Sequence, residues 1–186
     1  MTLPAELRVE IASIGQDVTA PVAGFTLSPR DEILLRRGGA DGLKIYQDLA
    51  RDGHTGSVLR KRRQAVVARE WTVDAGGEAP ADEQAAELLR AVLRRIRFDR
   101  LCQGLLGSVL TGMAVAEVLW TSAELEVGGT RRTWLVPGEV RVRNPRRFRF
   151  SAEGELRLLT WDAPLDGIAL PERKFLLARF WAEETE

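Results

Sequence analysis

The stretch from Gly112 to Trp120, which reads GMAVAEVLW, marks the point at which the sequence changes from helical to strand-like patterning. Before it, apolar residues recur at helical spacing, which predicts a helix over Asp99–Thr111. Gly112 belongs to the residue type that most often ends a helix. After it the period changes to two, which predicts a strand over Ala114–Trp120.

Three further helices are predicted upstream of this stretch, over Leu43–Arg51, Thr55–Arg69 and Ala81–Arg97. The last has the clearest amphipathic pattern. Acidic residues near its start and basic residues near its end complement the helix dipole. The short stretch Glu70–Val73 alternates and contains aromatic and β-branched residues, so it predicts a strand between the helices.

Downstream of Trp120, short strand-like stretches are separated by turn residues. The predicted strands are Leu125–Val127, Trp134–Val136, Val140–Val142, Phe148–Phe150, Leu156–Trp161 and Lys174–Phe180. The predicted turns are Gly128-Gly129, Pro137-Gly138, Asn144-Pro145 and Glu153-Gly154. Helices followed by an antiparallel β meander predict an α+β fold.

The composition is that of a globular protein with one substantial domain. The chain has 186 residues, of which 45% are hydrophobic and 29% are charged. Residues 1–30 are rich in Pro, Gly, Thr and Ser and show no helical period, so we expect an extended N-terminal arm. The remainder, 31–186, is expected to form the α+β domain.

The charges balance, with 27 basic and 27 acidic residues, so the net charge indicates no polyanionic partner. Their distribution is uneven: Arg60–Arg63 and Arg131–Arg149 are basic, whereas Glu78–Glu87 and Trp181–Glu186 are acidic. Such asymmetry fits either a charged partner on one face or head-to-tail pairing of identical chains.

The sequence contains no transmembrane stretch and no signal peptide pattern, so we expect no membrane partner and synthesis in the cytoplasm. A disulfide within the chain is impossible because Cys102 is the sole cysteine.

No set of residues predicts catalysis, a cofactor or a metal site. His54 is the single histidine, and its place at a helix start is typical of a capping or surface residue. Cys102 is flanked by apolar residues and is expected in the core. Glu117 lies within an apolar strand, where a structural ion-pair partner is a more common role than an acid catalyst. We therefore expect that the protein is not an enzyme.

Two groups of arginines are candidate contact residues. The first is Arg62, which helical geometry places within the apolar stripe of the helix Thr55–Arg69, with Arg69 further along the same side. Arg62 either lays its stem along the core and extends its head to water, or it is paired at a contact with another subunit or domain.

The second group is Arg141, Arg143, Arg147 and Arg149, which alternate along strand-like segments, so that several could share one face. That face either binds phosphates or is an ordinary solvated face. The first alternative gives a second hypothesis for the whole chain, a small nucleic-acid-binding protein with an arginine-rich β face.

The order of several motifs, from about residue 30 to the end of the chain, resembles that of the Mu-like phage portal proteins. The motifs are Asp31–Leu34, Gly38-Gly39, Tyr46–Asp52, His54, Ser57–Leu59, Arg62-Arg63, Trp71, Phe98, Leu101, Gly112–Trp120, Pro145–Phe150 and Leu170–Phe175. No single motif is diagnostic, and the resemblance rests on the ordered series.

The resemblance implies a structural protein of a phage or prophage. Portal proteins form a ring, typically a dodecamer, at one capsid vertex of the virion. The ring binds the terminase, the capsid and head-tail adaptor proteins, and double-stranded DNA passes through it during packaging and ejection. Portal chains have a wing, a stem and a clip and are longer than this one. The resemblance therefore implies that this chain is the wing-like N-terminal portion, without stem and clip.

Overall fold

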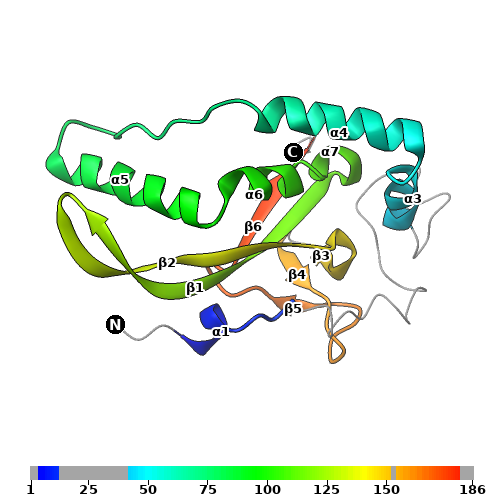
Figure 1. Ribbon diagram of the computed structural model, residues 1–186. Coiled ribbons are helices and arrows are strands. Elements are labelled where there is room, and N and C mark those ends of the chain that lie inside the picture. The colour runs from blue at the N-terminus through cyan, green and yellow to red at the C-terminus, as the bar shows by residue number, and fades with distance from the viewer. Residues whose placement is uncertain (1–3, 13–41, 152–153, 181–186) are drawn as a thin grey trace.

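The computed structural model describes residues 4–12, 42–151 and 154–180 (Figure 1). The helices are α1 (Ala5–Arg8), α3 (Gly42–Leu49), α4 (Gly53–Val67), α5 (Pro80–Arg95), α6 (Phe98–Leu105), α7 (Ser108–Thr111) and the 3-10 turn η3 (Pro145–Arg147). The strands are β1 (Met113–Val127), β2 (Thr130–Arg143), β3 (Phe148–Phe150), β4 (Leu156–Leu158), β5 (Ile168–Ala169) and β6 (Phe175–Arg179). Helices followed by antiparallel sheets confirm the α+β class.

The strands form two antiparallel sheets, one with the order β2-β1-β6 and one with the order β3-β4-β5. Helices α4, α5 and α6 lie on one side of the first sheet, and α1 lies on the other (Figure 1). The chain departs from a simple meander at its last strand, because β6 returns to pair with β1. As a result β1 is the central strand.

A long hairpin of β1 and β2 replaces several of the short predicted strands. Its turn, Gly128-Gly129, is confirmed, and both glycines have positive φ angles of 58° and 69°, as a tight hairpin turn requires. The turn predicted at Pro137-Gly138 is wrong, because both residues lie within β2. The register shifts there, opposite Leu119/Trp120, and such a bulge accommodates a proline that has no N–H for the ladder.

The helices agree with the predicted ranges except between Asp99 and Thr111, where the chain forms two helices. α6 ends before Gly107 and α7 begins after it, and Gly112 ends α7 with a φ of 74°. The strand predicted at Glu70–Val73 is wrong, since no ladder partner lies beside it. Trp71 packs edge-to-face on Phe98 of α6 instead, and its indole N–H donates to Asp99.

The core lies on both faces of β1. The six residues Met113–Val118 are all buried, which accounts for the uninterrupted apolar run in the sequence. Val115 packs on one face with Ala12, Phe148 and Leu158. The helices α5, α6 and α7 contact the strand as well. The one charged residue in this run is Glu117, and the candidate site is built around it.

Candidate functional site: an ionic cluster beneath the N-terminal segment

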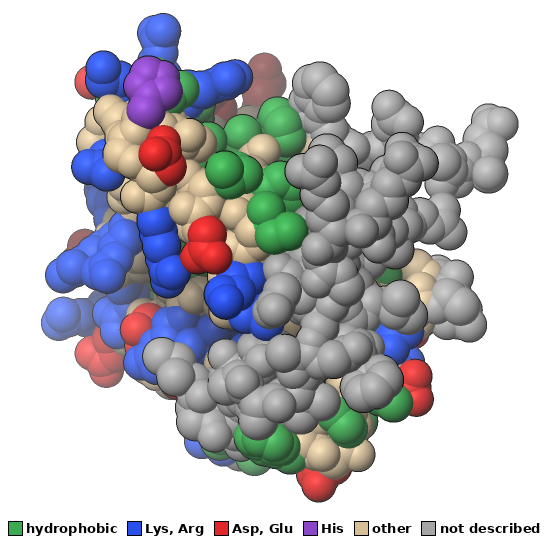
Figure 2. Space-filling view, turned by 90° about the vertical axis from the view of Figure 1, so that its right-hand side faces the viewer, with side chains coloured by type: hydrophobic (Ala, Val, Ile, Leu, Met, Phe, Trp, Pro, Cys, Tyr) green, Lys and Arg blue, Asp and Glu red, His purple; other side chains and the backbone are tan. Residues whose placement is uncertain are grey.

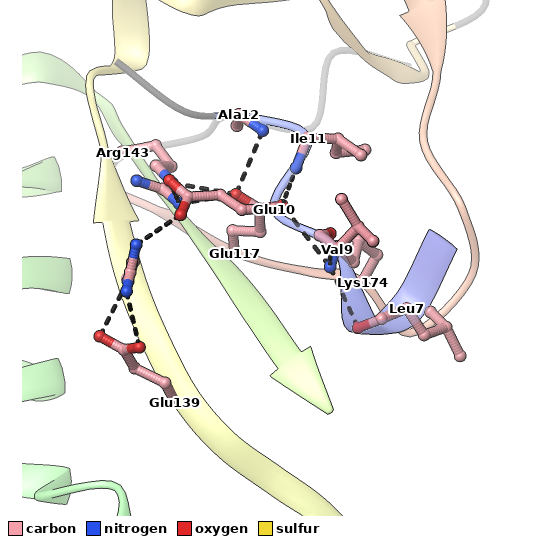
Figure 3. Close-up of polar contacts among 10 residues, drawn as sticks. Leu7, Val9, Glu10, Ile11, Ala12, Glu117, Glu139, Arg143 and Lys174 are labelled. Atoms are coloured by element: carbon pink, nitrogen blue, oxygen red, sulfur yellow. Dashed lines mark hydrogen bonds and ion pairs between the residues drawn. The ribbon is translucent and has the colours of Figure 1, made fainter. Parts of the chain in front are cut away.

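Glu117 lies at the centre of a buried cluster of charged side chains (Figure 3). Its carboxylate is fully buried and accepts hydrogen bonds from Arg143 of β2 at 2.8 and 3.0 Å. The ammonium of Lys174, also fully buried, lies 3.6 Å away. The strand pairing positions these groups, because β2 and β6 flank β1 and the backbone of Lys174 accepts from the amide of Val118 at 2.8 Å.

The cluster binds the backbone of the N-terminal segment, which we define as residues 7–12. The amides of Ile11 and Ala12 donate to the Glu117 carboxylate at 2.7 and 3.2 Å. In the opposite sense, the Lys174 ammonium donates to the carbonyls of Leu7 and Val9 at 3.1 and 2.8 Å. Donors and acceptors of the segment are thus both matched by buried charges, and charge-assisted hydrogen bonds are stronger than neutral ones.

A side chain of the segment joins the cluster to its solvent-exposed edge. Glu10 forms ion pairs with Arg143 and with Arg141, so it bridges two residues of β2. Arg141 also forms two hydrogen bonds of 2.8 Å with Glu139. Three carboxylates therefore face three basic groups, and exposure increases outward from the fully buried Glu117 to the half-exposed Glu139.

Three of these groups, Lys174, Glu139 and Arg141, have shifted pKa values. Burial lowers the pKa of Lys174 below its usual 10.5, and the neighbouring carboxylate of Glu117 opposes that shift. At the exposed edge, the hydrogen bond from Arg141 lowers the pKa of Glu139 below its usual 4.5. The ion pairs and hydrogen bonds of the cluster join the segment to β1, to β2 and to the residue before β6.

The arrangement is suited to attachment rather than to chemistry on a substrate. Every partner of Glu117 is a group of the protein, namely two amides, a guanidinium and an ammonium. Its role as a structural ion-pair partner, expected from the sequence, is confirmed. Glu10 and Lys174 were missed because a sequence shows that a buried carboxylate needs a cation, but does not show which distant residue supplies it.

The predicted orientation of Arg62 is wrong. Arg62 and Arg69 are exposed, and the stripe that surrounds Arg62 faces away from the protein, with Val58 and Val66 about half exposed. The packed face of α4 carries the half-buried Arg63 instead. Its Nε is buried without a hydrogen-bond partner in the structure, and its guanidinium lies against Gly107. The roles of Arg62 and Arg69 in a contact stay a prediction.

The four arginines of the predicted β face do not share one face. Arg141 and Arg143 belong to the ionic cluster. Arg147 is buried in η3, and Arg149 of β3 donates to the carbonyl of Leu165. The alternation was misleading because the chain leaves the first sheet after Arg143 and enters the second at Phe148. Their roles as subunit or DNA contacts remain untested, although Arg143 and Arg147 are too buried to form an open phosphate-binding surface.

The remaining candidate residues have structural surroundings. His54 is exposed in the first turn of α4, where Asp52 accepts from its amide and from that of Thr55 at 3.1 and 2.8 Å. Burial raises the pKa of the Cys102 thiol, which opposes formation of a reactive thiolate. In the ranges that the structure describes, no group of His, Cys, Asp and Glu could hold a metal ion. None of the helices described there could span a bilayer.

Comparison with known proteins identifies a family. A family model described as the portal protein of Mu bacteriophage matches residues 43–186. No curated protein matches the chain. The matched range begins with α3 and includes every strand. It leaves out the N-terminal segment, and also the motifs at 31–39, which lie outside the described residues.

Proposed function

Because this chain belongs to the Mu bacteriophage portal protein family, we propose that it is a structural subunit of a portal ring at one vertex of a phage or prophage capsid. The observation that carries the proposal is the family match, which extends over α3–α7 and over both sheets. The family is one of structural proteins, and its members assemble as oligomers. The chain would therefore act by binding other proteins and further copies of itself.

Within the ring, the chain would supply a wing-like N-terminal portion. Its α+β architecture supports this assignment, with helices on one side of a three-stranded sheet. The domain boundary predicted near residue 30 is part of the proposal. The complete ring would admit and release double-stranded DNA and join the head to the tail. The partners would be the terminase, the capsid and the head-tail adaptor proteins, and the location would be the virion, after synthesis in the host cytoplasm.

The ionic cluster would fix the N-terminal segment to the wing. A portal subunit has to keep its shape against the forces of DNA packaging. The backbone hydrogen bonds from the segment to Glu117 of β1 and to Lys174, just before β6, would add rigidity to the central sheet. With the segment in place, its amides contact Glu117 and that carboxylate is fully buried.

The proposal is tested by the mass and the shape of the assembled protein. We expect mass photometry of the chain, expressed with the capsid proteins of its own phage, to show one discrete oligomer. Negative-stain imaging of that oligomer should show closed rings with a central opening. A protein that stays strictly monomeric under these conditions contradicts the proposal.

A further inference from the structure

Two exposed surfaces of opposite charge lie in different parts of the fold, and each contains apolar side chains that no part of the described chain covers. One is on α4, which runs along the top of Figure 1, and the other joins β4 to β5, at the lower right. An exposed apolar group with charged neighbours is typical of a protein interaction site.

The first surface, which we call the α4 stripe, consists of Val58, Arg62, Val66 and Arg69. At 100° per residue these four lie within one quarter of the helix circumference, next to the quarter that carries the half-buried Leu59, Arg63 and Val67. Val58 is 44% exposed and Val66 is 55% exposed. Figure 2 shows further basic side chains gathered around the histidine at the beginning of this helix.

The basic groups of the α4 stripe have no acidic partner within the described ranges. No ion pair joins Arg62 or Arg69 to any described residue, in contrast to Arg141 and Arg143 in the cluster. A guanidinium between two exposed valines is suited to bind an acidic group that has apolar neighbours. The stripe therefore selects a partner that offers both.

The second surface, which we call the acidic loop, is the stretch 161–168 between β4 and β5. Its exposed apolar side chains are Trp161 at 54%, Leu165 at 49% and Ile168 at 39%. Asp162 forms no ion pair with a described residue, and Asp166 is 91% exposed and has one weak contact at 3.7 Å. This surface has the chemistry that the α4 stripe requires.

The acidic loop is held in one conformation by its own sheet. The guanidinium of Arg157 donates to the carbonyls of Asp166 and Gly167 at 2.9 and 3.2 Å, and Arg149 donates to the carbonyl of Leu165. Arg149, predicted as a contact residue, thus holds the loop in place by a hydrogen bond to its backbone. A preorganised loop loses little conformational entropy on binding.

We infer that the α4 stripe of one copy binds the acidic loop of the next copy. Two different patches of one chain that complement each other generate a head-to-tail contact, and such contacts repeat around a closed ring. The apolar side chains, among them Val66 and Trp161, supply the centre of the interface, and Arg62 pairs with Asp162 at its edge. The inference rests on the proposed function, because it names the interface by which the portal subunits assemble.

Charge reversal tests the interface. The variants are Arg62→Glu, Asp162→Arg and the double variant with both changes, and the matched control is Arg131→Glu. Arg131 is also exposed, at 76% of its side chain, and lies at the tip of the β1–β2 hairpin. All three positions are exposed, and circular dichroism verifies that each variant is folded. Mass photometry over a dilution series then gives the affinity between subunits.

We expect each single reversal to weaken association about tenfold or more, because like charges then meet across the contact. The double variant restores assembly, as does a mixture of the two single variants, since reversed charges match again. The control assembles like the wild type. Wild-type rings that none of the reversals weakens would overturn the interface and leave the proposed function intact. A wild-type chain that stays monomeric would overturn both.

Discussion

At the scale of single residues, the least expected feature is the burial of Glu117, Arg143 and Lys174 at the centre of the sheet. Removing charged groups from water is unfavourable unless each finds partners, and breaking a buried pair leaves an uncompensated charge. Here the partners include backbone groups of residues 7–12. The cluster therefore ties the correct docking of that segment to the folding of the sheet.

Replacing Glu117 by Gln should lower the free energy of unfolding by about 3–5 kcal/mol, because Lys174 and Arg143 would stay buried without their shared counterion. The measurement is urea denaturation of both proteins. The matched control is Glu124→Gln on the same strand, where the side chain is 68% exposed and a change within about 0.5 kcal/mol is expected. Equal effects of the two substitutions would contradict the claim that the buried ion pairs of Glu117 stabilise the fold.

Stability should also depend on pH through Lys174. Its folded-state pKa is lowered by burial, so between that value and 10.5 the unfolded chain binds more protons than the folded one. The free energy of unfolding then rises with pH across this window. In melting curves from neutral to alkaline pH, the wild type should gain stability relative to Lys174→Met. The control is Lys61→Met, which removes an exposed lysine, and the wild type should show no such gain relative to it. A difference between wild type and Lys174→Met that does not change with pH would be inconsistent with this shift.

Residue-scale predictions from the sequence succeeded where a local rule applied. Gly112 ends its helix because a left-handed residue is needed there. The orientation of Arg62 was predicted wrongly because four consecutive basic residues sweep the whole helix, and two neighbouring faces of α4 carry apolar residues. Which apolar side packs depends on α6, far along the chain, and the pattern of α4 alone does not contain that information.

At the scale of elements, the periodicity of the sequence predicted the strands of the β1–β2 hairpin but not the bulge within it. Alternation correctly indicated strands on both sides of Gly128-Gly129. It could not indicate that Pro137-Gly138 is a bulge, since the same residue pair is common in turns. Pairing with β1 across fourteen residues of β2 decides the matter, and it is a non-local interaction.

The close approach of α6 to β2 gives a test at this scale. A Cβ atom at Gly104 would lie 2.5 Å from Cγ2 of Val142. The helix can therefore pack this closely on the strand because Gly104 has no side chain. Gly104→Leu should reduce stability by about 1–3 kcal/mol, as overpacking typically does. Thermal unfolding measures the effect.

The control for this substitution is Gly76→Leu, in the loop before α5, where a Cβ atom would meet nothing within 4 Å. We expect that control to melt close to the wild type. If Gly104→Leu melted like the control, the helix would not lie against β2 as closely as described.

At the scale of the whole molecule, the sequence indicated the fold class and the family, but not which distant segments contact each other. Helices before strands indicated the α+β class, and the ordered motifs identified the family that the match over 43–186 shows. The docking of residues 7–12 beneath β1 was not predicted, because an N-terminal stretch rich in Pro and Gly carries no periodic signal. Nor was the return of β6 to β1, which depends on contacts between residues about sixty positions apart in sequence.

The chain has no net charge, but its charged side chains are unevenly distributed over the surface. In the described ranges, several arginines of the sheets form ion pairs with carboxylates or hydrogen bonds with carbonyls, whereas those of the α4 stripe form neither. A subunit with a basic surface and an acidic surface in different parts of its fold can remain neutral overall and still assemble head to tail.

The position of the chain in the phage particle tests most directly whether it is a portal subunit. An epitope tag at the N-terminus of the chain, labelled with gold-conjugated antibody on opened particles, reports that position by electron microscopy. We expect label at a single vertex of each capsid, where the tail joins. Label spread over the whole shell, label along the tail, or particles that lack the chain would contradict this expectation.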